Sequence, residues 1–207
     1  MTVLYIDTSS SYLYAGIVKD SNLVSEIKEE LGHNLSEVAL PKIAEMFEKS
    51  SILPNQVDKI IVVNGPGSFT GIRVGLTIAK VYAWSLNIPI TTITSLEAMS
   101  VGINERVVVP LIDALKDNCY AAIYEDGKEV LKPQHISLDK LKEILNNYRD
   151  YIIVTNDSID LNFKKCNYDP QIETIVNKFC SKENINPHYV NPEYLKLSAA
   201  EEAKNDN

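Results

Sequence analysis

Long hydrophobic runs are absent from this chain. No stretch of its 207 residues approaches the roughly 18 consecutive apolar residues that a membrane-spanning helix needs. The first residues lead directly into a strand-like run, without the basic segment or the cleavage site of a secretory signal. We therefore expect a cytoplasmic protein with no membrane contact.

Clustered cysteines and histidines are also missing. Cys119, Cys166 and Cys180 are odd in number and far apart, which suits a reducing compartment and argues against a disulfide framework or a zinc site. The histidines are equally scattered, and no His-x-x-x-His pair is present to place two imidazoles on one helix face. We expect neither a metal nor another cofactor.

The chain has no excess of positive charge. It carries 20 Lys and Arg against 28 Asp and Glu, which gives a formal net charge of -8. An acidic chain repels a phosphate backbone and releases few counterions on binding it. We therefore expect that the chain does not hold nucleic acid tightly by itself.

Glycine is absent from the last part of the chain. All eight glycines lie at or before Gly127, so residues 128–207 contain none. A protein backbone generally needs glycine where it approaches a phosphate closely. This distribution argues against tight ATP binding between two halves of the chain.

The glycines that are present gather in the run Asn64–Gly75, which reads NGPGSFTGIRVG. Residues 59–63 before it are apolar and β-branched, which predicts a buried strand. Ser68 or Thr70 can cap a helix that continues to about Leu86. Such a turn can bind phosphate, but the spacing fits neither a P-loop nor a Rossmann motif. We favour a packing role.

The helix that follows this turn has small residues at every fourth position: Gly71, Gly75, Ala79 and Ala83. Such a stripe lets another backbone approach closely. Two helical glycines, each costing about 1 kcal/mol relative to alanine, need a reason of this kind. The polar arc is narrow and contains Arg73, Thr77 and Lys80, with Trp84 among them. The helix must therefore be covered by its own sheet and also by either a second layer or another chain.

The expected elements of the first half alternate between strands and helices. In order they are strands at 3–6, 12–19 and 23–28, a helix at 35–49, a strand at 59–63, the glycine-opened helix, a strand at 89–94 and a helix from residue 95. A meander continued by parallel strands with helical crossovers is the layout of an actin-like (ribonuclease-H-like) domain.

A second round of elements is expected after residue 104. It comprises strands at 107–113, 119–124, 128–131 and 151–155 and helices at 138–147 and 172–182. We expect an α/β protein of the actin-like (ASKHA) class with two related halves and mixed sheets. The domains are residues 1–104 and a smaller C-terminal domain, 105–207, whose tail begins a helix and packs back.

Several motifs occur in the order found in one known family. They are Ile6-Asp7-Thr8-Ser9, His33 followed by Leu40-Pro41, the run 64–73, Ser95-Leu96-Glu97-Ala98, Asp113-Ala114 with Tyr120, and Pro192-Glu193-Tyr194-Leu195. Over its whole length the chain closely resembles the TsaB (YeaZ) family of bacterial tRNA threonylcarbamoyladenosine biosynthesis subunits. The Gly-Pro-Gly-Ser-Phe-Thr-Gly run is the most specific of these motifs. The chain departs from the family at 115–119, where a basic residue and a glycine usually precede the tyrosine.

The resemblance implies a subunit without catalytic residues, metal or cofactor. Its partner would be TsaD, a related actin-like protein that transfers a threonylcarbamoyl group to the adenosine 3' of the anticodon in tRNAs reading ANN codons. The TsaE ATPase would join the pair. The chain would form a homodimer when alone and would meet tRNA only through the complex.

The resemblance also implies an interface built from the first two helices of the N-terminal domain. The residues expected there are His33, Leu35, Val38, Phe69, Gly71, Ile72, Arg73, Gly75, Leu76 and Ala79. A weak nucleotide contact is left open at the first loop, at Asp7, Thr8 and Ser9.

Two other functions stay open from the residues themselves. A metal-dependent, peptidase-like hydrolase could use Asp7 and Asp113, since both end apolar strands and could face each other across a cleft. The favoured interpretation is that these aspartates bond neighbouring loop N–H groups, and that His33 is a cap or interface residue. A small-molecule kinase of the actin-like class is disfavoured by the missing glycines.

Overall fold

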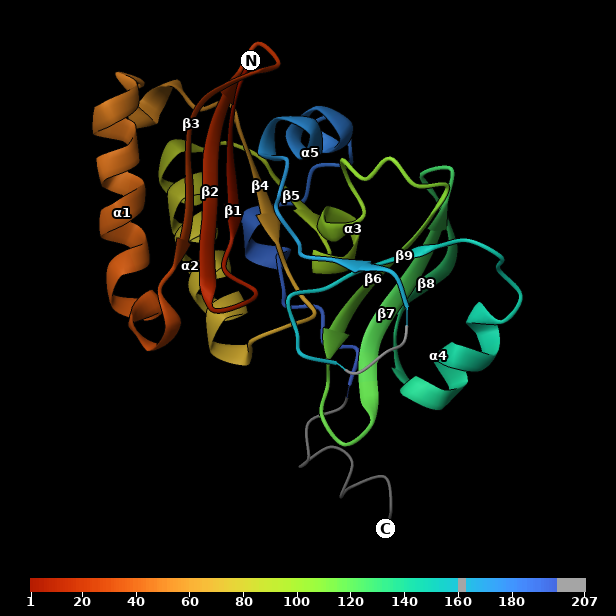
Figure 1. Cartoon of the computed structure of the whole chain (residues 1–207). Coiled ribbons are helices and arrows are strands. Elements are labelled where there is room, and N and C mark those ends of the chain that lie inside the picture. Colours follow the sequence, from red (N-terminus) through yellow and green to blue (C-terminus); the bar gives the residue numbers. More distant parts are fainter. Residues whose placement is uncertain (160–162, 197–207) are drawn as a thin grey trace. The chain divides into compact units, whose positions relative to one another are not determined.

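The computed structural model describes residues 1–159 and 163–196 (Figure 1). The chain forms two compact units. Unit 1 comprises residues 1–102 and 169–192, and the described part of unit 2 comprises residues 103–159, 163–168 and 193–196. Residues 169–192, which the sequence analysis assigned to the second half, therefore group with the first sheet. The helix expected in the tail beyond residue 196 lies outside the described residues.

Unit 1 is built on a five-stranded mixed sheet with the strand order β3-β2-β1-β4-β5. Its strands are β1 (Thr2–Asp7), β2 (Tyr12–Lys19), β3 (Asn22–Glu30), β4 (Lys59–Val63) and β5 (Ile90–Ile93). The first three form an antiparallel meander, and β4 and β5 continue it in parallel with β1. The predicted order of elements and the actin-like fold class are confirmed.

The helices of unit 1 cover both faces of this sheet. They are α1 (Leu35–Ser50), α2 (Phe69–Leu86), α3 (Ser95–Met99) and α5 (Ile172–Phe179), with short 3-10 turns η1 (Gly32–Asn34), η2 (Pro54–Gln56) and η3 (Pro187–Tyr189). Alternate residues of β2, such as Leu13 and Ala15, share one core with α1 and α2. Gly16 points the other way and faces Ile172 of α5. Because both faces are covered, all six residues of the central strand β1 are buried.

An aromatic pair holds α1 and α2 together. The rings of Phe47 and Tyr82 are stacked with centroids 6.0 Å apart, and the Tyr82 hydroxyl donates a hydrogen bond of 2.7 Å to the carbonyl of Pro54. Burial raises the pKa of Tyr82 to about 12, so the hydroxyl keeps its proton and stays a donor. The pair therefore joins both helices to the turn η2.

The sheet of unit 2 begins like the sheet of unit 1, with a three-strand antiparallel meander followed by a strand parallel to the first. Its five-stranded sheet has the order β10-β9-β6-β7-β8 and consists of β6 (Val107–Asp113), β7 (Asn118–Glu125), β8 (Lys128–Ser137), β9 (Ile152–Val154) and β10 (Lys165–Cys166). Helix α4 (Leu138–Leu145) packs on one face, over Cys119 and Ala121. Burial raises the pKa of the Cys119 thiol to about 12, which leaves it unreactive.

Some boundaries differ from the sequence analysis. Strand β8 extends to Ser137, six residues beyond the expected end at Leu131, because its pairing with β7 continues past a register shift as far as Asn118. Helix α5 ends at Phe179 instead of residue 182, and the two-residue strand β10 was not expected. No helix of the described residues is long and apolar enough to cross a membrane.

We expect that Tyr82→Phe will lower the free energy of unfolding by about 1 kcal/mol, the usual net value of one hydrogen bond. The variant keeps the ring that stacks on Phe47 but loses the bond to the Pro54 carbonyl. Urea unfolding followed by circular dichroism measures the change. An unchanged midpoint would show that water replaces the bond without cost. Tyr189→Phe is the control, because that side chain is 75% exposed.

Candidate functional site

The first loop, which follows β1, carries the aspartate expected to end the strand. Asp7 is 2% exposed, and its Oδ1 accepts hydrogen bonds from the Ser9 backbone N–H at 2.8 Å and the Ser9 hydroxyl at 2.7 Å. Burial raises the pKa of this carboxyl above its ordinary value, and the bonds from Ser9 oppose that shift. The interpretation of Asp7 as a residue that bonds neighbouring loop groups is confirmed.

The glycine-rich turn lies directly against this loop. The Ser68 N–H donates to the Ser9 carbonyl at 2.7 Å, and the Thr8 hydroxyl donates to the Gly71 carbonyl at 2.7 Å. Ser68 is also the N-cap of α2, since its hydroxyl accepts a bond from the Gly71 N–H at 3.2 Å. The N-terminus of α2 is therefore fixed to the end of β1 by hydrogen bonds in both directions.

The small-residue stripe of α2 explains why this helix and the loop after β1 can lie so close together. A Cβ atom on Gly71 would overlap the Thr8 carbonyl oxygen, and one on Gly75 would overlap the Thr8 hydroxyl. The glycines thus permit a close approach within this chain. The geometry supports the packing interpretation of the glycine run, because Thr8 fills the space in front of α2.

The residues expected at the partner interface separate into two groups. Six are buried inside unit 1: Leu35, Gly71, Ile72, Gly75, Leu76 and Ala79. The others are at least partly accessible: His33, Val38, Phe69 and Arg73. Ile72, Leu76 and Ala79 face inward because they supply the apolar side of α2 to the core of unit 1.

The opposite side of α2 is the accessible one. At 100° per residue, Phe69, Arg73, Thr77, Val81 and Trp84 fall on one arc of the helix, and all five are exposed. Phe69, Val81 and Trp84 are 54%, 60% and 67% exposed. The Arg73 guanidinium lies 3.8 Å from the centroid of the Phe69 ring. We call these five residues the outer arc of α2.

The sequence pattern predicts only part of this accessible surface. It places Trp84 on the narrow polar arc of α2 but does not single out Val81. Leu40 on α1 is 56% exposed and was noted only as part of a motif. On a helical wheel Val81 lies between the exposed Thr77 and the half-buried Val74, at the margin of the outer arc, so the helical period alone does not decide whether it is covered.

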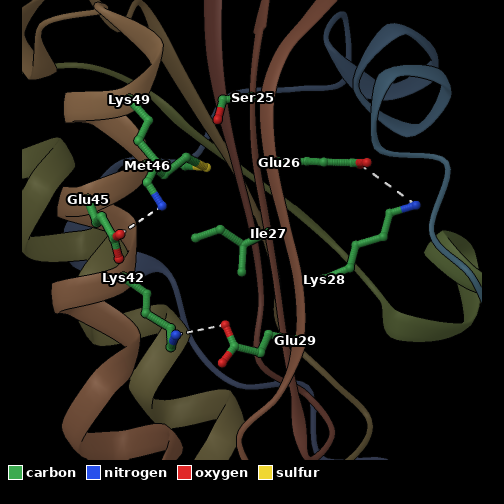
Figure 2. A pocket seen from close by; sticks show the side chains of 9 residues that line it. All are labelled: Ser25, Glu26, Ile27, Lys28, Glu29, Lys42, Glu45, Met46 and Lys49. Atoms are coloured by element: carbon green, nitrogen blue, oxygen red, sulfur yellow. Dashed lines mark ion pairs between the residues drawn. The ribbon is translucent and has the colours of Figure 1, made fainter.

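A pocket between β3 and α1 has charged walls (Figure 2). Lys42 pairs with Glu29 at 2.7 Å, and Lys49 pairs with Glu45 at 2.7 Å. Lys28 points away from α1 and pairs with Asp169 of unit 1 at 2.8 Å. Because its cations and anions neutralise one another, the pocket does not select a charged ligand.

The remaining chemical candidates are divided between unit 1 and unit 2. His33 is exposed in η1, and in unit 2 the Asp113 carboxylate accepts a bond of 2.8 Å from the Leu115 N–H, as expected for a loop-bonding aspartate. Within residues 1–159 and 163–196 no group of three His, Cys, Asp or Glu side chains could hold a metal ion. The three cysteines are free thiols.

A comparison with family models gives a match over most of the chain. The model described as TsaD, tRNA N6-adenosine threonylcarbamoyltransferase, matches residues 23–164. Among curated proteins, the tRNA threonylcarbamoyladenosine biosynthesis protein TsaB of Bacillus subtilis is 28% identical over 97% of this chain and 96% of its own length. The TsaB protein of Haemophilus influenzae is 33% identical over 58% of this chain and 52% of its own length.

Solved structures show the same fold. YeaZ from Pseudomonas aeruginosa superposes with a TM-score of 0.74 at 19% identity, covering 94% of this chain and 99% of its own. An uncharacterized protein with similarity to peptidase YEAZ, from the same organism, gives a TM-score of 0.80 at 18% identity with the same coverage.

We expect that Gly71→Ala will destabilise the protein by about 1–3 kcal/mol, the range for overpacking a filled site. The loss should outweigh the gain in helix propensity of about 1 kcal/mol that alanine brings. Urea unfolding provides the measurement. Thr77→Ala, a change on the outer arc of the same helix, is the matched control and should leave stability nearly unchanged. A variant as stable as the wild type would show that Thr8 can move aside at no cost.

The raised pKa of Asp7 predicts a pH dependence of stability. Burial favours the neutral carboxyl in the folded state, so the contribution of this group is fully present below its unfolded pKa. That contribution is lost as the pH rises through the higher folded pKa. We expect the stability of the wild type relative to Asp7→Asn to fall from about pH 4 toward neutral pH, because asparagine does not titrate.

Unfolding free energies of both proteins, measured over this pH range, test the expectation. A relative stability that rises with pH would contradict it, because the Ser9 bonds would then favour the charged carboxylate more than burial disfavours it.

Proposed function

Because the chain belongs to the tRNA N6-adenosine threonylcarbamoyltransferase (TsaD) family and resembles TsaB (YeaZ) proteins over its length, we propose that it is a non-catalytic subunit in tRNA threonylcarbamoyladenosine biosynthesis. The related subunit TsaD performs the transfer to the adenosine 3' of the anticodon in tRNAs that read ANN codons. The TsaE ATPase joins the pair, and the complex works in the cytoplasm.

The chemistry of the first loop supports a non-catalytic role. The Asp7 carboxylate and the Thr8 hydroxyl make their hydrogen bonds within unit 1, to Ser9 and Gly71. A general base must reach a substrate proton, and a buried carboxyl that is held by its own loop is poorly placed for this. The loop instead positions α2. Its bonds leave Asp7 and Thr8 little capacity for the nucleotide contact that the resemblance left open.

The outer arc of α2 carries the proposal. Its exposed Phe69, Val81 and Trp84 form an apolar surface of the kind that protein partners cover, with aromatic side chains typical of interface anchors. Leu40 adds an exposed apolar side chain from α1, which packs beside α2. The partner is TsaD in the active complex, and a second copy of this chain occupies the surface when TsaD is missing.

The six buried residues expected at the interface have a supporting role in this proposal. Gly71, Gly75 and Ala79 let α2 lie close to the sheet, which fixes the direction of the outer arc. The accessible residues make the contact, with Arg73 stacked on Phe69 as a cationic group at its N-terminal end. The net charge of -8 agrees with tRNA being held through the complex and not by this chain alone.

We expect that Trp84→Ala will weaken association with TsaD and with a second copy by about 2 kcal/mol, the scale of an interface anchor. The fold should survive, because this side chain is 67% exposed. Sedimentation velocity measures association, and threonylcarbamoyl transfer to tRNA by the reconstituted subunits measures function. The transfer should require the wild-type chain and should fall with the variant.

The matched control is Leu115→Ala, which removes a side chain that is 70% exposed in unit 2. It should associate and support transfer as the wild type does. If Trp84→Ala associates as strongly as the wild type, the outer arc is not part of the interface. Transfer by TsaD and TsaE without this chain would contradict the proposed function itself.

A further inference from the structure

Residues 180–190, which we call the strap, follow α5 and lie along β5, an edge strand of the unit 1 sheet, which we call sheet 1. The Ile185 N–H donates to the Ile90 carbonyl at 2.7 Å, and the two residues form an antiparallel bridge. The Thr91 hydroxyl lies 3.3 Å from the Lys182 carbonyl and 3.1 Å from that of Glu183. The strap thus makes polar contacts along β5 of unit 1.

This position matters because β5 is an edge strand of its sheet. An uncovered edge presents unpaired N–H and C=O groups to which another chain can pair. Proteins commonly protect such an edge with a loop. The strap supplies that cover, and its far end is anchored by Val190, which is 2% exposed in the core of unit 1.

A buried lysine holds the near end of the strap. Lys59, the first residue of β4, is 5% exposed, and its Nζ donates to the Cys180 carbonyl at 2.7 Å and to the Lys182 carbonyl at 3.0 Å. These carbonyls follow the C-terminus of α5, where backbone acceptors lack helical partners and a cation is favoured. Among the described residues, no carboxylate forms an ion pair with Lys59.

Burying the charged amino group of Lys59 costs free energy, and in the described part of the chain its two hydrogen bonds to strap carbonyls offset that cost. Burial lowers the pKa of Lys59, which shows that its environment disfavours the charge. The other charged contacts of the strap are more accessible. Lys182 pairs with Glu97 at 2.9 Å with 40% and 20% of the two side chains exposed, and exposed pairs contribute little. Lys80 also donates to the Val190 carbonyl of the strap at 2.9 Å, from a half-buried position. Lys59 is more deeply buried and binds two strap carbonyls, so it is the main polar contact at the near end of the strap.

We propose that Lys59 is the latch of the strap, and that the latched strap closes the β5 edge of sheet 1 against pairing with another chain. The methylene stem of Lys59 fills its buried site, and its amino group binds the two carbonyls. Loss of the amino group opens the strap locally, while the strands beneath keep their mutual pairing.

Hydrogen exchange of the Ile185 amide, in the full-length protein, tests the latch. Lys59→Met keeps the stem but removes both hydrogen bonds, so Ile185 should exchange about 10 to 100 times faster, the factor expected for lost bonds to a charged donor. Lys182→Met is the matched control, since it removes the exposed pair with Glu97 from the same strap, and it should change this rate by less than about threefold. Amides of β1 should keep their wild-type rates.

An unchanged rate at Ile185 in Lys59→Met would overturn the proposal. The proposal would also be overturned if the amides of β1 exchanged faster by the same factor as Ile185, because Lys59 would then stabilise unit 1 as a whole and not the strap. If Lys59→Met does not fold, Thr91→Val serves with the same readout, since it removes the hydroxyl contacts to Lys182 and Glu183 but keeps the size of the side chain. Thr91→Val should speed up exchange of the Ile185 amide and not of the β1 amides. An unchanged Ile185 rate would reject the proposed role of the strap.

Sedimentation equilibrium tests the closed edge. The variants that open the strap should self-associate more strongly than Lys182→Met at equal concentration, also when combined with Phe69→Ala. Phe69 belongs to the outer arc and lies at the first turn of α2, whereas Trp84 lines a pocket together with strap residues 184–188. The Phe69→Ala background therefore separates pairing at β5 from association through the outer arc, so failure of one proposal is distinguishable from failure of the other. Equal association of opened and control variants would overturn the role of the strap as an edge cover.

Discussion

The close approach between α2 and the loop after β1 is the constraint on which unit 1 depends. Thr8 touches the helix at Gly71 through its carbonyl oxygen and at Gly75 through its hydroxyl, where the helix itself has no side chain. The contact sets the distance of α2 from the sheet and its rotation about its own axis. It therefore directs Ile72, Leu76 and Ala79 into the core and the outer arc to solvent.

The same contact determines what the first loop can do. Its carboxylate and hydroxyl groups are satisfied by Ser9 and Gly71, so the loop supports the fold and its polar groups are engaged within the chain. The accessible side of α2 presents Phe69, Val81 and Trp84 together with polar side chains, in a chain whose net charge is negative. This combination favours recognition of a protein surface over direct binding of nucleic acid.

Unit 1 also depends on a contact that joins distant parts of the sequence. Lys59 begins β4, whereas the carbonyls it binds belong to Cys180 and Lys182. Together with Ile185 on β5 and Ile172 beneath β2, this contact brings residues 169–192 back to the first sheet after the chain has formed unit 2. The returning segment thus completes both a face and an edge of that sheet.

The sequence by itself determined the order of the main elements, the actin-like class and the loop-bonding role of Asp7, because hydrophobic periods, caps and turn residues act between near neighbours. Tertiary structure decided that the small-residue stripe meets Thr8 of the same chain, that Val81 stays exposed, and that residues 169–192 join unit 1. The two-residue strand β10 exists only through its pairing with β9. Each of these depends on which distant segment fills the facing space, and a local pattern carries no information about that choice.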